Sequence, residues 1–222
     1  MALILNLETA TTNCSVSLAE DGEIMALKEH NSESYSHSEQ LHVFIEKVMQ
    51  EAGKDFQDLD ALTVSSGPGS YTGLRIGVSA AKGLCFALDI PLIAVSTLES
   101  LAHLKKGENG FIIPVLDARR MEVYSAVFDA NYTMVREVAA EIIDEQSFMA
   151  YAAKDKVHII GSGAAKCRAH LKHSNLSFND TAVPTASIMG KLAHEKFLKK
   201  AFEDVAYYEP FYLKDFIGNK IK

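Results

Sequence analysis

Apolar and turn-forming residues alternate in short runs over the first 29 residues. Residues 3–7 are mostly apolar, and residues 14–18 and 24–29 follow as two further short runs. The intervening segments, 9–13 and 20–22, carry residues that favour tight turns. Short runs of this kind separated by turns are typical of antiparallel strands. The pattern therefore predicts a meander of three strands.

Longer segments then repeat apolar residues at helical spacing. Residues 36–53 predict a helix that stops at a glycine, and residues 71–88 predict a second helix. The β-rich run 59–66 lies between these helices. Residues 91–95 predict another buried strand, and residues 97–104 a short helix.

The first pattern starts again after a polar break at residues 105–109. An apolar strand ends in an acid in both halves, at Glu8 and at Asp117, and five residues separate each acid from the next strand. That next strand begins at Cys14 in the first half and at Val123 in the second. The recurrence predicts a duplicated structural unit.

The rest of the second half is less regular. It predicts a strand at 157–160, a helix at 185–202 and an extended tail at 208–213. In each half, an antiparallel meander is followed by an α/β crossover. This arrangement predicts an α/β protein with two mixed sheets and flanking helices. This is the ribonuclease-H-like or actin-like architecture. We place one subdomain at residues 1–103 and the other at 104–222, and expect the last helix and tail to pack back on the first.

Composition narrows the function classes. The chain has 22 basic and 29 acidic residues, a formal charge of −7. Such a protein gains little from counterion release, so we do not expect it to hold nucleic acid alone. Three cysteines, at 14, 85 and 167, lack paired metal spacing. We expect them to be reduced and buried in a cytoplasmic protein that does not contact a membrane.

The most distinctive segment is Gly67-Pro68-Gly69-Ser70-Tyr71-Thr72-Gly73, between a predicted strand and a predicted helix. One hypothesis is that Gly67, Gly69, Ser70 and Thr72 hold a phosphate at the helix N-terminus. The other is a tight turn capped by Ser70, with later glycines at 73 and 77 that permit close helix packing. The segment matches neither a Walker A loop nor a dinucleotide fingerprint, which favours the turn.

Glu8 and Asp117 could together bind a metal ion between the subdomains, as in sugar kinases of this fold. The turn after Glu8 adds no further acid, and the equivalent turn carries Arg119 and Arg120. These neighbouring residues favour the interpretation that Glu8 and Asp117 each simply end a strand and do not bind a metal ion. The histidines at 37 and 42 lie about 140° apart on the predicted helix, so we do not expect them to share a metal ion. The histidines at 170 and 173 could share one helical face, but no acid or thiol of obvious use lies beside them. We expect no metal and no cofactor.

The predicted second helix is apolar on two sides. One side faces its own sheet with a stripe from Leu74 to Leu88, whereas the opposite side carries only apolar or very small residues. Arg75, Ser79 and Lys82 make only a narrow polar strip. That second side is either buried under the neighbouring helix or used to bind a partner. Our hypothesis is a partner surface that includes residues of the preceding helix, namely Val43, Phe44, Lys47, Ile76, Ala80, Gly83 and Ala87.

The run 67–77 resembles the signature of the TsaB (YeaZ) family. Three further segments are similar to that family: 4–10, 91–98 and 209–213. The resemblance is close over the N-terminal half and loose over the C-terminal half. It implies an actin-like fold and a part in making threonylcarbamoyladenosine in tRNA.

The resemblance also implies a comparison with the related metalloenzyme TsaD. The two histidine ligands of TsaD correspond to Thr97 and Leu101, its first-turn acid corresponds to Thr12, and its late aspartate falls near Pro184. A leucine cannot bind a metal, and a threonine hydroxyl is a poor replacement for imidazole. The resemblance therefore implies a protein that has lost this catalytic site.

The resemblance to the TsaB family also implies a set of binding partners. A TsaB protein forms homodimers, binds a TsaD-type transferase through its two N-terminal helices, and is joined by a TsaE-type ATPase. It would reach tRNA only indirectly. Two alternatives are an ATP-dependent kinase that uses Glu8, Asp117 and the loop 67–73, and a metallopeptidase. The missing ligands disfavour the peptidase, and the lack of glycine in 117–122 disfavours the kinase.

Overall fold

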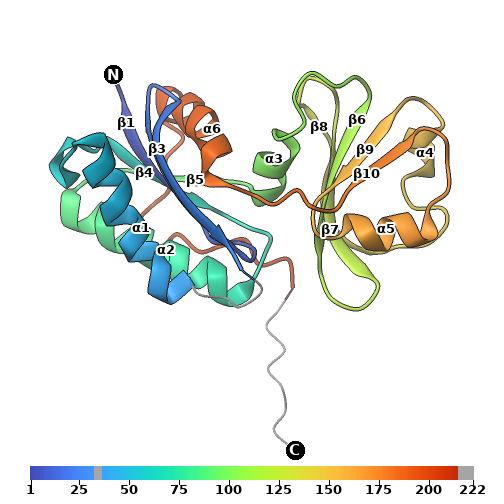
Figure 1. The fold of residues 1–222 in the computed structure, drawn as a ribbon, viewed down its shortest axis with the longest axis horizontal. Coiled ribbons are helices and arrows are strands. Elements are labelled where there is room, and N and C mark those ends of the chain that lie inside the picture. The colour runs from blue at the N-terminus through green and yellow to red at the C-terminus, as the bar shows by residue number, and fades with distance from the viewer. Residues whose placement is uncertain (33–36, 215–222) are drawn as a thin grey trace, which may run out of the picture.

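The computed structural model describes residues 1–32 and 37–214. Two five-stranded sheets lie side by side with helices against their faces (Figure 1). The first sheet has the order β3-β2-β1-β4-β5 and contains β1 (Leu3–Glu8), β2 (Asn13–Glu20), β3 (Glu23–Asn31), β4 (Ala61–Ser65) and β5 (Leu92–Val95). The second has the order β10-β9-β6-β7-β8 and contains β6 (Phe111–Asp117), β7 (Glu122–Phe128), β8 (Met134–Ile142), β9 (Val157–Ile160) and β10 (Leu176–Asn179).

The two sheets are built alike. In the first, β1 pairs antiparallel with β2 and parallel with β4, and in the second β6 does the same with β7 and β9. The outer pairs follow the same rule: β2–β3 and β7–β8 are antiparallel, whereas β4–β5 and β9–β10 are parallel. The duplicated unit and the two mixed sheets that the sequence predicted are therefore confirmed.

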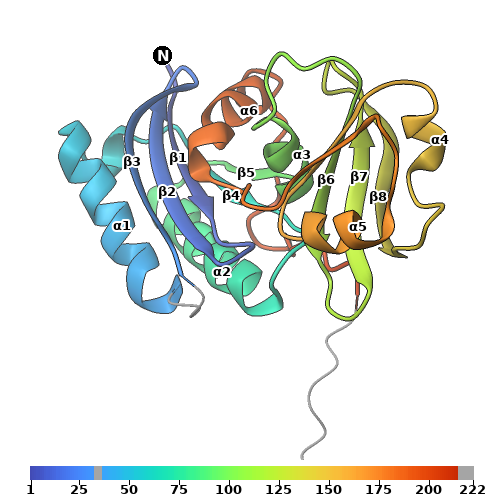
Figure 2. The same ribbon diagram turned by 45° about the vertical axis from the view of Figure 1, so that its right-hand side comes forward.

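Helices cover both faces of the first sheet. The helices α1 (His37–Ala52) and α2 (Tyr71–Leu88) pack side by side on one face, and α6 (Ala186–Leu198) packs on the other (Figures 1 and 2). Successive side chains of a strand point to opposite faces. Leu5 and Leu7 accordingly join the core cluster under α1 and α2, whereas Ile4 joins the cluster under α6. Burial on both faces explains why β1 is almost continuously apolar.

The second sheet has a core on each face as well. The helices α4 (Met149–Ala152) and α5 (Ala164–His170) belong to one face. The short helix α3 (Thr97–Ala102) packs on the other, and it lies between the two sheets in Figure 1. We call the first sheet with α1, α2 and α6 the first lobe, and the second sheet with α4 and α5 the second lobe. The subdomain boundary after residue 103 stays a prediction.

Several elements differ from the sequence prediction. The pattern missed β8, β10, α4 and α5, and it extended the last helix to residue 202, although α6 ends at Leu198. The strand β8 is at the sheet edge and much of it is exposed, so it lacks a regular apolar alternation. The predicted first helix began at residue 36, which lies outside the described residues. No helix in the described ranges is long and apolar enough to cross a membrane.

Candidate functional site

The glycine-rich segment forms a tight connection between β4 and α2. The Gly67–Pro68 peptide is cis, and Gly67 has a φ of +105°, which favours glycine. The side chain of Ser70 accepts a hydrogen bond from the amide of Gly73 at 3.3 Å. Ser70 is thus the N-cap of α2, as the turn hypothesis predicted.

Protein atoms fill the space beside the glycines of this connection. A methyl group at Gly69 would overlap the carbonyl oxygen of Ala10, and one at Gly77 would overlap the hydroxyl of Thr9. The same hydroxyl donates a hydrogen bond to the carbonyl of Gly73 at 2.8 Å. Close packing of α2 against the turn after β1 therefore accounts for these glycines. The phosphate-binding hypothesis has no support from these contacts.

A pocket of about 900 Å³ lies between the two lobes. The connection at 68–72 lines it from the first lobe, and residues 116–120 line it from the second. Two carboxylates at this pocket already have cationic partners. Asp117 pairs with Lys166 at 2.6 Å, and Glu122 pairs with Lys214.

The two strand-end acids occupy different surroundings. Glu8 is fully buried, and one carboxylate oxygen, Oε1, accepts the amide of Ala10 at 2.6 Å. Burial raises the pKa of Glu8 to about 7. Asp117 is exposed, lines the pocket and is held by Lys166. The proposed metal-binding pair therefore combines a buried acid with an exposed acid already bound to a lysine.

The structure places the histidines of the two pairs in separate surroundings. His37 is buried, and its Nε2 lies 2.7 Å from the carbonyl oxygen of Thr11. The helix α5 ends at His170, so His173 lies beyond it and the two cannot share a helical face. Among residues 1–32 and 37–214, no group of three or more His, Cys, Asp or Glu side chains is arranged to hold a metal ion.

The positions that correspond to TsaD ligands are built into the core or the pocket wall. Leu101 is fully buried in the cluster that joins α3 to the second sheet. Thr97 is also buried, and its amide donates to the carbonyl of Gly67 at 3.0 Å. Thr12 and Pro184 line the pocket between the lobes. Leu101 therefore offers no donor atom to a metal ion at the position that corresponds to a histidine ligand of TsaD.

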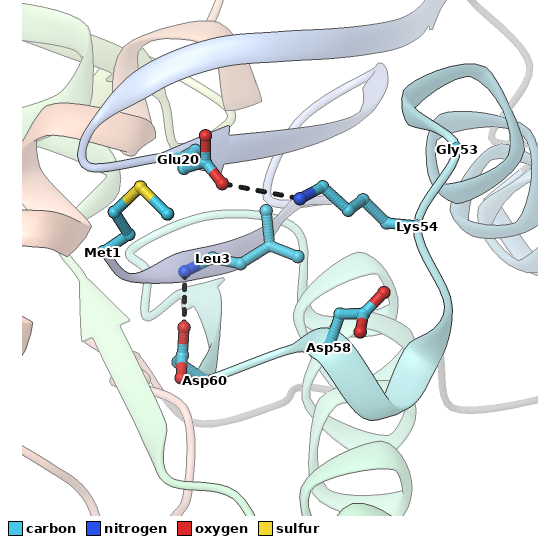
Figure 3. Close-up of a pocket in the computed structure, with 7 residues that line it drawn as sticks. All are labelled: Met1, Leu3, Glu20, Gly53, Lys54, Asp58 and Asp60. Atoms are coloured by element: carbon cyan, nitrogen blue, oxygen red, sulfur yellow. Dashed lines mark hydrogen bonds and ion pairs between the residues drawn. The ribbon is translucent and has the colours of Figure 1, made fainter.

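A second, smaller pocket of about 460 Å³ lies near the N-terminus (Figure 3). Its acidic side chains already bind neighbouring groups. Asp60 accepts the amide of Leu3 at 2.7 Å, and Glu20 pairs with Lys54 at 3.5 Å, as Figure 3 shows. The first contact fastens β1 to the residue before β4, and the second joins the end of β2 to the segment after α1. We therefore assign the pocket a structural role.

The hypothesised partner surface is partly open in the single chain. Val43 is 43 % exposed, and Lys47, Gly83 and Ala87 are exposed. The other three members, Phe44, Ile76 and Ala80, are half-buried against the core cluster of the first lobe. The opposite stripe of α2, from Leu74 to Cys85, is buried on the sheet. Packing of α1 beside α2 therefore covers only part of the second apolar side.

Sequence reasoning missed one residue of this surface. Phe86 lies on α2 and is 85 % exposed. At about 100° per residue it falls beside Ser79, within the narrow polar strip of the predicted helix. An exposed phenylalanine among small residues is the kind of side chain that anchors an interface. Its position on a helical wheel could have identified it.

Comparison with known proteins agrees with this architecture. The family model of TsaD, tRNA N6-adenosine threonylcarbamoyltransferase, matches residues 30–219. Two relatives are each named tRNA threonylcarbamoyladenosine biosynthesis protein TsaB. The one from Haemophilus influenzae is 31 % identical over 96 % of this chain and 93 % of its own length, and the one from Escherichia coli is 31 % identical over 98 % and 96 %. The chain belongs to the TsaB family.

Solved structures give the same assignment. YeaZ from Pseudomonas aeruginosa matches with a TM-score of 0.83 and 25 % identity, over 96 % of this chain and all of that one. A second structure from that organism, described as similar to the peptidase YeaZ, matches with a TM-score of 0.82 and 26 % identity over the same shares. The TsaB-family chain thus has the two actin-like subdomains that the sequence predicted.

Proposed function

We propose that this chain is a non-catalytic subunit of the complex that adds threonylcarbamoyl to adenosine 37 of tRNA. In this proposal it binds and supports a TsaD-type transferase. A TsaE-type ATPase joins the complex, a second copy of the chain can take the place of the transferase, and tRNA is contacted only indirectly. Membership of the TsaB family supports the role in tRNA threonylcarbamoyladenosine biosynthesis.

The residues at the positions that correspond to the TsaD metal ligands support a non-catalytic role. Leu101 contributes its side chain to the core between α3 and the second sheet, and Thr97 offers only a hydroxyl. Glu8 is buried, and Asp117 is held by Lys166. Neither acid lies in surroundings that resemble a metal site with open positions. We infer that catalysis belongs to the transferase.

The single observation that carries the partner role is the open side of α1 and α2. Phe86 on α2 and Val43 on the neighbouring α1 are exposed, and small residues occupy positions 80, 83 and 87 of α2. Small residues at spacings of three and four allow a second helix to approach closely, and interdigitating ridges fix the crossing. A partner that contributes two helices would complete a four-helix layer. Because the core of the first lobe lies on the other side of α2, association need not disturb the fold.

The decisive test places a charge on this surface. Ala80→Glu addresses the centre, and Ala87→Glu addresses an exposed position where the single chain loses no packing. An unpaired charge in a desolvated contact costs several kcal/mol, which lowers affinity by orders of magnitude. Ala169→Glu, on an exposed position of α5 in the second lobe, is the matched control.

Three measurements read the result. Sedimentation reports the homodimer, pull-down reports binding of the TsaD-type transferase, and a nucleoside assay by mass spectrometry reports modified tRNA. We expect the α2 variants to lose all three activities and Ala169→Glu to keep them, with circular dichroism unchanged. Normal association by folded Ala80→Glu and Ala87→Glu would place the interface elsewhere. Modified tRNA formed by this chain alone would contradict the non-catalytic role.

A further inference from the structure

The chain beyond α6 runs along the first lobe before it reaches the second. We call residues 199–214 the brace. The amide of Glu203 donates to the carbonyl oxygen of Leu92 on β5 at 2.9 Å, so the brace begins against the edge of the sheet. Further along, the amide of Phe211 donates to the carbonyl oxygen of Ser66 at 2.8 Å. Backbone hydrogen bonds thus fix the brace to the first lobe at two separate points.

Side chains of α2 hold the middle and the end of this segment. The Lys82 ammonium donates to the carbonyl oxygens of Ala206 and Tyr208 at 3.0 and 3.1 Å. The ring of Tyr212 packs on that of Tyr71, with 4.8 Å between centroids. These contacts connect the brace to the helix that carries the proposed partner surface. They make its attachment to the first lobe extensive.

The attachment to the second lobe is far smaller. Lys214 forms an ion pair with Glu122 of β7 and lies 5.8 Å from the centroid of the Tyr124 ring. The two charged side chains are 35 % and 30 % exposed. Ion pairs this exposed contribute little to stability and are screened by salt. The contact with the second lobe is therefore the weakest part of the brace.

This weak contact lies at the pocket between the lobes. Residues 211–214 form part of the pocket wall, as do Glu122 and Tyr124. The helix α3 packs on the second sheet through an apolar cluster and also contacts α6 of the first lobe. The packed helix α3 can therefore act as a hinge between the lobes, and the weak ionic contact of Lys214 can hold them together at the pocket.

We propose that the pair Lys214–Glu122 is a releasable latch that holds the two lobes at their observed angle. With the latch closed, the brace spans the pocket and limits movement of the second lobe. When high salt or the loss of either charge releases it, the lobes turn about α3 and the pocket widens. This inference concerns the geometry of the single chain and does not depend on the proposed partners.

The test measures the distance between the lobes by pulsed electron spin resonance. Spin labels at Gln57→Cys and Glu145→Cys report from exposed positions in the first and second lobes. The native cysteines are all buried and free, and burial raises the pKa of each thiol, so they should not take the label. Dilution with unlabelled protein removes distances between copies.

We expect one narrow distance distribution for the otherwise native chain at low salt. Lys214→Glu and Glu122→Lys should each add a population at longer distance, and 1 M salt should do the same to the native pair. Combining the two reversals restores an ion pair, so the double variant should recover most of the short distance. Lys191→Glu, which reverses a pair with Glu23 inside the first lobe, should change nothing.

Two outcomes would overturn the latch. If both single reversals keep the native distribution, the contact does not hold the lobes. If the single variants shift but their combination does not recover, the shift has another cause than this pair. Circular dichroism of every variant separates lobe movement from loss of fold.

Discussion

The buried carboxyl of Glu8 should make the protein less stable as the pH rises. An ordinary glutamate has a pKa of 4.5, whereas burial raises the pKa of Glu8 to about 7 in the folded chain. Between these values the folded state keeps a proton that the unfolded state has lost. Stability from this group is therefore complete below pH 4.5 and is lost as the pH rises through 7.

The size of the effect follows from the same two values. One pKa unit corresponds to about 1.4 kcal/mol, so the shift from 4.5 to about 7 amounts to about 3 kcal/mol. Glu8 is fully buried, so solvent screening does not reduce this figure. Because the free energy of unfolding of a protein is small, about 3 kcal/mol is a large share of it.

Glu8→Gln removes the ionisation and keeps the oxygen that accepts the amide of Ala10. We expect the variant to lack most of the decline in unfolding free energy that the wild type shows between pH 5 and pH 8. Urea unfolding followed by circular dichroism at several pH values gives both curves. Comparing the pH dependence, rather than stability at one pH, cancels the cost of burying an amide group.

The effect of net charge is controlled with a variant at an exposed glutamate. Glu46→Gln removes one negative charge from an exposed position on α1 and controls for the change in net charge. If the wild type and Glu8→Gln lose stability in parallel from pH 5 to pH 8, the carboxyl of Glu8 does not ionise in the manner that its burial implies.

Three further predictions concern packing and reactivity. Gly77→Ala should destabilise the chain by about 1–3 kcal/mol, because the methyl group would overlap the Thr9 hydroxyl. Gly83→Ala, on the same helix with open space around it, should instead be neutral or add up to about 1 kcal/mol in the same denaturant titration. Ser70→Ala should cost about 1 kcal/mol through loss of the α2 cap, and restoration by Ser70→Asp would confirm the capping role. The three buried cysteines, Cys14, Cys85 and Cys167, should react with a thiol reagent only when the protein unfolds. Burial raises the pKa of these thiols to about 11, 12 and 12, respectively. Rapid labelling of the folded protein at pH 8 would contradict this prediction.

Elements whose patterns are strong and local could be predicted from the amino-acid sequence. The meander of β1, β2 and β3 and the helix α2 lie where their periodicity placed them, and α2 has the predicted bounds. The cap at Ser70 and the close approach at Gly77 also follow from residue type and spacing. These features depend on neighbouring residues and on one buried face, so a single sequence contains the information.

Features that depend on contacts between segments far apart in the sequence became clear only from the folded structure. Glu8 and Asp117 each end a strand in the same local pattern, yet one is buried and the other is exposed beside Lys166. Lys82 looked like part of a polar strip, but it holds a chain segment more than 120 positions later in the sequence. The edge strand β8 forms because β7 pairs with it, since its own pattern is too weak to predict it. Periodicity can indicate which face of an element is apolar, but only the packed fold decides what covers each face.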